Sequence, residues 1–501
     1  MKHFWQKAVV ALLLPLLLSC SPSKMEEEVL ETTVYGETSL PKMEGNLTYS
    51  FEGKDIFVDE EKHTVSGTKA GTETLLHLEN GKEKKDVLVK VTNRPYESRH
   101  AKAEEREGWF KEVEIDPIAR KEGFANGMDI SSCKQLIDAG TRYYNEEGVE
   151  ESLFRILSEH EVNWVRFRLW NDPYNHNNQD SPYGGGGGDL SSTLWMAKQA
   201  KYFGLNILLD LHYSDFWTDP GSQVIPKAWA NLATSNEMAE AISSYTSKTL
   251  QEFAKIGATP DMIAIGNEVT GGMLYQLPGE DKASLTGGNP GYIDGKKNAP
   301  SLIAGTVGTE NFKKYLKAGL DAVHSIDSKI LTMVHIAQSF TNLDAIQWFY
   351  DEISDLSYDV IGLSAYSYYH YESQSILESS LSSLSAHFPS KKIAIAETSY
   401  GFTYEGDENA SNTFYSSGDA KPINGYPCSI QGQASIISDA IKAVASLSNG
   451  FGLFYWEGAW TPRKGCGWGD ERSKCSWANQ GLFSYDGKAL GSLSLFQKTL
   501  S

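Results

Sequence analysis

Short apolar runs, separated by longer segments of helical periodicity, recur along the chain from Gly123 onward. Each run begins with near-continuous apolar residues and ends in polar or aromatic ones. This pattern is typical of parallel strands whose sheet is covered by helices. The eight runs are FANGMDIS from Phe124, NWVRFRLW from Asn163, NILLDLHYSD from Asn206, MIAIGNEV from Met262, ILTMVHIA from Ile330, VIGLSAYS from Val360, KIAIAETSY from Lys392 and FGLFYWEG from Phe451.

Eight such alternations predict an α/β fold, a (β/α)8 TIM barrel with long loops. The competing fold is a doubly wound open sheet, which usually carries a Gly-rich phosphate loop after its first strand. The residues after Phe124 contain no such loop. Because barrels place their chemistry at the carboxyl ends of the strands, the polar strand ends predict a site there.

The chain before the barrel has a different pattern. From Glu28 to Asn93, short alternating stretches such as Thr64–Gly67 are broken by Gly and Asn, which predicts a small antiparallel β-sandwich of immunoglobulin-like size. The charged segment from Glu97 to Glu107 then reads as a linker. We assign residues 20–115 to a tether, the sandwich and the linker, and residues 116–501 to the catalytic barrel. The sandwich is expected to act as a spacer or docking domain.

The first residues carry a targeting pattern. Lys2 and Lys7 precede an apolar run from Ala8 to Leu18, which is too short to span a bilayer and predicts a signal peptide over residues 1–19. The run ends in Leu-Leu-Ser-Cys, which resembles the bacterial lipobox, so Cys20 is the expected site of lipidation. We therefore expect an exported lipoprotein anchored in the membrane, at the outer membrane or cell surface or facing the periplasm.

Charge and composition narrow the class of ligand. A formal net charge of −20 argues against nucleic acid as a partner, since polyanions require clustered Lys and Arg. The chain has 12 Trp, 25 Tyr and 20 Phe, and an aromatic excess suits binding to the faces of sugars. No Cys and His cluster indicates zinc. Nothing points to an obligate assembly, and a monomer is expected.

Three of the predicted strands end in a glutamate: Glu268, Glu397 and Glu457. Retaining glycoside hydrolysis needs two carboxyl groups about 5 to 5.5 Å apart, one to protonate the leaving oxygen and one to attack the anomeric carbon. A structural ion pair is the alternative role for any single glutamate at a strand end. Asn267 strengthens the catalytic interpretation, because an amide beside the acid can bind the sugar 2-hydroxyl in the transition state.

The Asn267-Glu268 pair with a glutamate at the seventh strand resembles clan A of the glycoside hydrolases. Within that clan the chain resembles family 53, the endo-β-1,4-galactanases, from about Gly123 to Ser492. The stretches that carry the resemblance are DLHYSDFWTDPG from Asp210, DVIGLS from Asp359, YP and QGQ from Tyr426, FYWEGAW from Phe454 and WANQGLF from Trp477.

The resemblance implies a role for each matching position. Glu268 would be the general acid/base and Glu397 the nucleophile, acting on β-1,4-galactan without any required cofactor. Arg168 would hydrogen-bond the nucleophile and keep it ionised, while Glu457 would form hydrogen bonds in the mouth. His212, Asn267 and Tyr366 would support catalysis, and Trp456 would form the floor under the sugar. Asp215, Trp217, His335 and Tyr400 are the remaining candidate substrate-binding residues.

Two alternatives and one metal site stay open at this level. Another clan A endo-glycanase, acting on a different β-linked polysaccharide, would share both glutamates. A non-catalytic surface glycan-binding lipoprotein would keep the barrel without the chemistry. The acidic loop after the seventh strand resembles a calcium-binding loop of bacterial family members, and Asp407 and Asn409 would supply oxygen ligands to a structural Ca²⁺.

Overall fold

The computed structural model describes residues 28–96, 107–176, 181–183, 186–279, 297–407, 412–413, 425–463, 466 and 478–500. The predicted signal peptide, the lipidation site Cys20 and the calcium candidate Asn409 lie outside these residues and stay predictions. Among the described residues, no helix combines the length and apolarity needed to cross a membrane.

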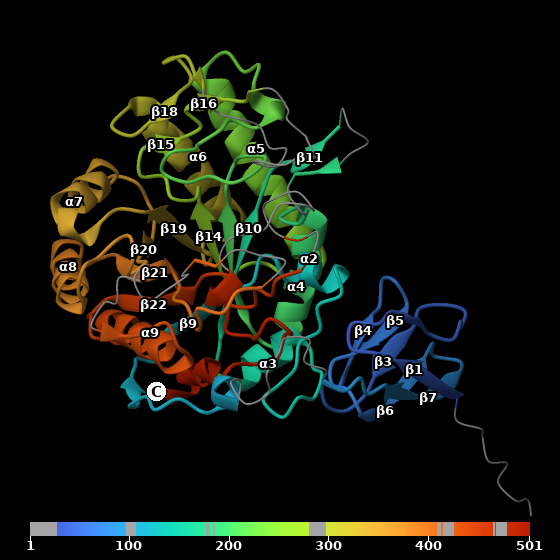
Figure 1. The fold of residues 1–501 in the computed structure, drawn as a ribbon. Helices are drawn as coiled ribbons and strands as arrows, with labels where there is room; N and C mark the ends of the chain where they lie inside the picture. Colours follow the sequence, from blue (N-terminus) through green and yellow to red (C-terminus); the bar gives the residue numbers. More distant parts are fainter. Residues whose placement is uncertain are drawn as a thin grey trace, which may run out of the picture.

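Eight parallel strands close into a barrel, which confirms the predicted fold (Figure 1). Strand β9 pairs with both β10 and β22, so the first and last strands seal the barrel. The strands are β9 (Ala125–Asp129), β10 (Trp164–Leu169), β13 (Asn206–Leu211), β14 (Met262–Ile265), β19 (Leu331–Ile336), β20 (Val360–Ser364), β21 (Lys392–Thr398) and β22 (Gly450–Tyr455).

Helices surround the barrel and begin at residues suited to cap them. Asp189 accepts a hydrogen bond from the Ser192 backbone N–H at the start of α4, and Thr234 forms a reciprocal capping box with Glu237 on α5. The helices are α2 (Cys133–Asp138), α3 (Leu153–Glu159), α4 (Leu190–Tyr202), α5 (Ser235–Lys255), α6 (Glu310–Ile326), α7 (Leu343–Glu352), α8 (Gln374–His387) and α9 (Ile430–Ala445).

Side chains alternate between the helix layer and the barrel interior along each strand. On β10, Val165 and Phe167 pack in the core between strands and helices, whereas Trp164 packs in a separate apolar cluster inside the barrel. Because strand side chains alternate, Arg166 and Arg168 share the interior side with Trp164. The barrel interior is therefore apolar at its amino end and charged at its carboxyl end.

The N-terminal region forms two sheets around a hydrophobic core of its own. One sheet has the order β1-β7-β6-β3 and the other β2-β5-β4. The predicted small sandwich is present, and its strand pairing departs from the antiparallel expectation at one place, where β1 runs parallel to β7. Alternation does not encode strand direction, and no hairpin joins these two strands. The bounds are β1 (Glu28–Thr32), β2 (Thr38–Ser39), β3 (Thr48–Ser50), β4 (Ile56–Asp59), β5 (Thr64–Gly67), β6 (Glu73–Glu79) and β7 (Lys84–Val91).

This region docks against the side of the barrel near α3 and α4 (Figure 1). The Ser152 backbone N–H donates to the Thr68 carbonyl at 2.7 Å, and the Tyr202 hydroxyl donates to the Ile56 carbonyl at 2.6 Å. Arg94 Nε donates to Glu150 Oε2 at 2.8 Å. Since Glu150 is buried, the N-terminal region supplies the cation that neutralises a carboxylate of the barrel.

We expect Arg94→Ala to lower the free energy of unfolding by about 1–3 kcal/mol, because it leaves the buried Glu150 carboxylate without its charged donor. Urea denaturation at neutral pH measures the loss. Lys62→Ala is the matched control, since Lys62 pairs with Glu37 at an exposed surface site and its loss should cost about 1 kcal/mol or less. Equal losses in the two variants would show that the Arg94 contact does not couple the two parts.

Candidate active site

A pocket of about 570 Å³ opens at the carboxyl ends of the barrel strands. It confirms the position that the polar strand ends predict. Segments that follow β13, β14, β20 and β22 contribute to its wall, and β21 contributes Glu397. Described residues lining the pocket include Trp217, Asp219, Asn267, Glu268, Tyr366, Tyr368, Tyr369, His370, Glu397 and Trp456.

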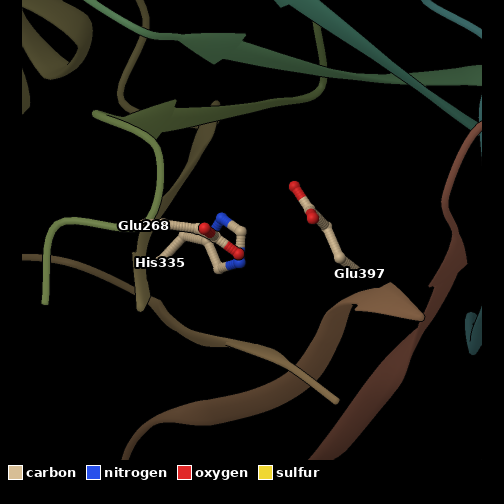
Figure 2. A group of neighbouring side chains, drawn as sticks. All are labelled: Glu268, His335 and Glu397. Atoms are coloured by element: carbon tan, nitrogen blue, oxygen red, sulfur yellow. The ribbon is translucent and has the colours of Figure 1, made fainter. Parts of the chain in front are cut away.

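Glu268 and Glu397 face each other across this pocket. One carboxylate oxygen of each, together with a ring nitrogen of His335, lies within 4.8 Å of the others. Figure 2 shows Glu268 and His335 side by side, with Glu397 opposite them. The short separation matches the spacing of retaining glycosidases and not the 6.5–9.5 Å of inverting ones.

Local backbone irregularities bring Asn267 and Glu397 into the pocket. Ile263 and Ile265 of β14 pack toward the helices, so regular alternation would send Asn267 outward as well. Gly266 instead adopts a left-handed φ of +80°, and Glu268 follows at +47°. On β21, Ala394 and Ala396 face the interior, and a register shift lets the next residue, Glu397, point inward too.

Arg166 is the buried cation that pairs with Glu397. Its Nη2 lies 2.7 Å from Glu397 Oε1 and 2.6 Å from Asp210 Oδ2, and its Nη1 lies 2.7 Å from Asp129 Oδ2. The Tyr366 hydroxyl donates to the other oxygen of Glu397 at 2.9 Å, so Tyr366 lies against the nucleophile candidate.

The prediction that Arg168 hydrogen-bonds Glu397 is therefore wrong. Arg168 forms a short ion pair with Glu457, and its guanidinium carbon lies 4.3 Å from the ring centroid of Trp217. Both arginines point into the barrel, but Arg168 lies two residues, about 6.6 Å, farther along β10. It therefore meets Glu457, which also accepts from Ser132 Oγ at 2.8 Å, as expected for a glutamate that forms hydrogen bonds in the mouth.

Asn267 is held in one orientation by its neighbours. Arg166 Nη2 donates to Asn267 Oδ1 at 2.9 Å, and Asn267 Nδ2 donates to the Thr218 carbonyl at 2.7 Å. His212 braces the same loop, since its Nδ1 accepts from the Thr218 backbone N–H at 3.2 Å. Nδ2 has a second hydrogen, and Asn267 lines the pocket, so this amide is placed to bind a sugar hydroxyl.

The two glutamates have different electrostatic surroundings. Burial and the negative charge of Glu397 raise the pKa of Glu268 well above its ordinary value. Burial also raises the pKa of Glu397, but Arg166 and the Tyr366 hydroxyl oppose that rise. The proton that this coupled pair retains thus belongs on Glu268, and the negative charge on Glu397. This is the division that an acid and a nucleophile require.

Three predicted substrate-binding residues are placed elsewhere. Asp215 is buried and accepts from the backbone N–H groups of Asp172 and Lys227, at 3.1 and 2.8 Å. Tyr400 is fully buried, and its hydroxyl donates to the Tyr426 carbonyl at 2.9 Å. His335 is also fully buried, with both ring nitrogens engaged. Their polar atoms bond to protein partners, and none of the three is among the described lining residues of the pocket, so their binding to substrate stays a prediction.

Trp217 and Trp456 line the pocket as predicted, with ring centroids 6.2 Å apart. Sequence reasoning missed Arg166, Ser364 and the pocket residues Asp219, Tyr368 and His370. The sequence did contain a signal for Arg166, because it lies two residues before Arg168 and therefore on the same side of the strand. Asp219, Tyr368 and His370 lie in loops, and Ser364 carries only a small hydroxyl. The sequence pattern gives no comparable signal for such residues.

Among the described residues, Glu268, His335 and Glu397 form the group whose spacing would suit a metal ion. Their surroundings fit a metal poorly. Arg166 places a positive charge against Glu397, and the nitrogens of His335 are occupied by Asn267 and Ser364. As for the predicted calcium site, Asp407 is buried and Asn409 lies outside the described residues, so that site stays a prediction.

A closed barrel with two opposed buried glutamates and aromatic rings at its carboxyl end defines the class of barrel glycoside hydrolases. The sequence profile of glycosyl hydrolase family 53 matches residues 125–496, and the chain belongs to this family.

Relatives support this assignment across most of their length. An endo-β-1,4-galactanase of Bacillus subtilis is 32% identical over 438 residues, covering 79% of this chain and 92% of the relative. An arabinogalactan endo-β-1,4-galactanase of Humicola insolens is 30% identical over 388 residues, covering 74% of this chain and 98% of the relative. The solved GH53 catalytic domain of Ignisphaera aggregans has a TM-score of 0.68 and 36% identity, covering 78% of this chain and all (100%) of that one.

Proposed function

We propose that this protein is a retaining endo-β-1,4-galactanase that hydrolyses pectic galactan, or type I arabinogalactan, by double displacement. The observation that carries the proposal is the approach of Glu268 and Glu397 oxygens to within 4.8 Å, inside a family 53 barrel. The names of the Bacillus subtilis and Humicola insolens relatives support the substrate.

In the first step, the protonated Glu268 gives its proton to the glycosidic oxygen while Glu397 attacks the anomeric carbon. Arg166 and Tyr366 orient the attacking carboxylate, and Asn267 Nδ2 binds the 2-hydroxyl as positive charge develops on the ring. Glu268, now ionised, then takes a proton from the water that releases the sugar from Glu397. The reaction uses these carboxyl groups and requires no cofactor.

The two tryptophans at the pocket wall supply flat apolar surface for the sugar. Trp456 lines the pocket beside the catalytic pair, and Trp217 packs next to it. The apolar face of a pyranose stacks well on such rings. We assign the floor beneath the sugar at the cleavage point to Trp456, and an adjoining sugar contact to Trp217.

Product analysis on unbranched β-1,4-galactan tests the proposal, with β-1,4-mannan, cellulose and xylan as controls. We expect a ladder of short galacto-oligosaccharides from galactan alone. Proton NMR of the earliest products should show the β-anomer first, which is the mark of retention. Activity on a different backbone would keep the barrel chemistry and discard the galactan assignment. If none of the four polysaccharides is hydrolysed, the result would favour a glycan-binding protein.

A further inference from the structure

We propose that Ser364 and His335 form, with Asn267 and Arg166, a hydrogen-bond relay of fixed direction that holds the proton on Glu268. The inference deepens the proposed function and rests on it for the role of Glu268 as acid. Neither Ser364 nor His335 touches the substrate pocket among its described lining residues, so both act as positioning residues.

The direction of the relay is set at its inner end by Arg166. A guanidinium can only donate hydrogen bonds, and a backbone carbonyl can only accept them. Because Arg166 Nη2 lies 2.9 Å from one end of the Asn267 amide and the Thr218 carbonyl 2.7 Å from the other, the amide oxygen must face Arg166. Asn267 Oδ1 is therefore fixed as an acceptor.

The next bond fixes the tautomer of His335. His335 Nδ1 lies 3.1 Å from Asn267 Oδ1, so Nδ1 must carry a hydrogen. Burial and the nearby charge of Arg166 lower the pKa of His335 to about 3, which leaves the ring neutral at working pH. A neutral ring protonated at Nδ1 has a bare Nε2, and Nε2 can only accept.

The remaining two bonds carry this direction to Glu268. Ser364 Oγ lies 2.9 Å from His335 Nε2, so the single hydroxyl hydrogen of Ser364 points at the imidazole. Ser364 Oγ also lies 2.5 Å from Glu268 Oε1. Toward an ionised Glu268, Ser364 Oγ would donate, and that bond would lower the pKa of Glu268. With its hydrogen committed to His335, Ser364 instead accepts, and Glu268 completes the chain when it is protonated.

When Glu268 ionises, the donors and acceptors of the relay no longer match. When Glu268 gives its proton to the glycosidic oxygen, Ser364 can rotate its hydrogen toward the new carboxylate, but His335 Nε2 then loses its donor. If the Ser364 hydroxyl keeps donating to His335, the carboxylate oxygen of Glu268 lacks a hydrogen-bond donor instead. Either loss is unfavourable. The relay therefore favours return of a proton to Glu268 from the attacking water.

Other charges around these groups stay in place when Ser364 changes, so a Ser364 variant isolates the relay. The groups that face Glu268 are Glu397 on β21, Asp219 after β13, Arg166 on β10, His335 on β19 and Tyr366 after β20. The groups that face His335 are Arg166, Asp210, His212 and His370.

The variant test is the pH dependence of kcat/KM for Ser364→Ala on the substrate that the enzyme cleaves. The acid must be protonated, so activity falls as pH rises through the pKa of Glu268. Without the relay the protonated form loses its acceptor, and we expect this basic limb to move down by about one pH unit. Ser364→Thr, which keeps the hydroxyl, should bring the limb back toward the wild-type position.

Ser367→Ala is the matched control. Ser367 follows the same strand and is buried, and its hydroxyl has no hydrogen-bond partner among the described residues. This variant should leave the limb unmoved. If Ser364 serves merely as a donor to ionised Glu268, Ser364→Ala will move the limb to higher pH, and that result overturns the proposal, as does an unmoved limb.

A second measurement needs neither a variant nor a substrate. Neutron diffraction from crystals of the deuterated full chain at neutral pH should show deuterium on His335 Nδ1 and on the Glu268 carboxyl, with Nε2 bare. Deuterium on Nε2 would overturn the relay. Because this readout is independent of galactan, a protein that fails the product test but shows this pattern refutes the proposed substrate and leaves the relay standing.

Discussion

Replacing Glu397 with Ala should lower kcat/KM on galactan by about 10⁴-fold or more, because the covalent intermediate can no longer form. Binding of galacto-oligosaccharides should survive, since the aromatic wall and Asn267 are untouched. Reducing-sugar assays and calorimetric titration measure the two effects separately. Adding azide with an aryl β-galactoside should restore turnover and give the α-galactosyl azide, because the small anion enters from the vacated side.

Glu268→Ala distinguishes the two carboxyl groups. It should lose about 10²–10⁴-fold on galactan, whose leaving group needs a proton, and far less in the first step on an aryl galactoside with an acidic leaving group. Azide should here yield the β-galactosyl product, formed on the intermediate at Glu397. An α product from this variant, or full galactan hydrolysis by Glu397→Ala, would require the two roles to be reassigned.

The second large effect concerns Arg166. Arg166→Met should lower the free energy of unfolding by about 3–5 kcal/mol at neutral pH, since three buried carboxylates would lose their shared cation. Urea denaturation measures the loss. Arg142→Met is the control, because the half-buried Arg142 stacks over Tyr144 and its loss should cost about 1 kcal/mol or less.

The destabilisation should depend on pH. Burial pushes the pKa of Asp210 up, but Arg166 and His212 outweigh it and hold that pKa below its ordinary value. A carboxyl with a depressed folded pKa contributes stability above its unfolded pKa, about 3.9, and loses it as pH falls further. The gap between wild type and Arg166→Met should therefore narrow in acid. A gap that stays constant with pH would mean that lost packing, not charge, is responsible.

The barrel and the two opposed glutamates could be predicted from the sequence because both depend on features that repeat. Eight apolar runs with polar ends define strands and the face they share, and Glu268 and Glu397 stand where two runs end. The pattern could not show which of several polar side chains near a strand end meets a given partner. Arg166 and Arg168 lie on the same side of β10, and which one meets Glu397 depends on the height of each strand in the closed barrel.

The same limit applies to His335, Asp215 and Tyr400, which the structure places against protein partners. A polar residue near a strand end can face the pocket or bond to a neighbouring segment, and the choice depends on partners distant in sequence. Asn267 makes the point in reverse. Alternation alone would turn it outward, and the left-handed backbone at Gly266 brings it in.

The shared guanidinium of Arg166 has an evolutionary consequence. Among the described carboxylates that pair with Arg166, Glu397 alone lines the pocket, and its pKa is raised, so its ionised form is held at a cost to the fold. A lineage that lost Glu397 would still pair Arg166 with Asp129 and Asp210 and would shed a buried charge. Loss of turnover in this barrel would thus need a single substitution, at Glu397, that stability does not oppose.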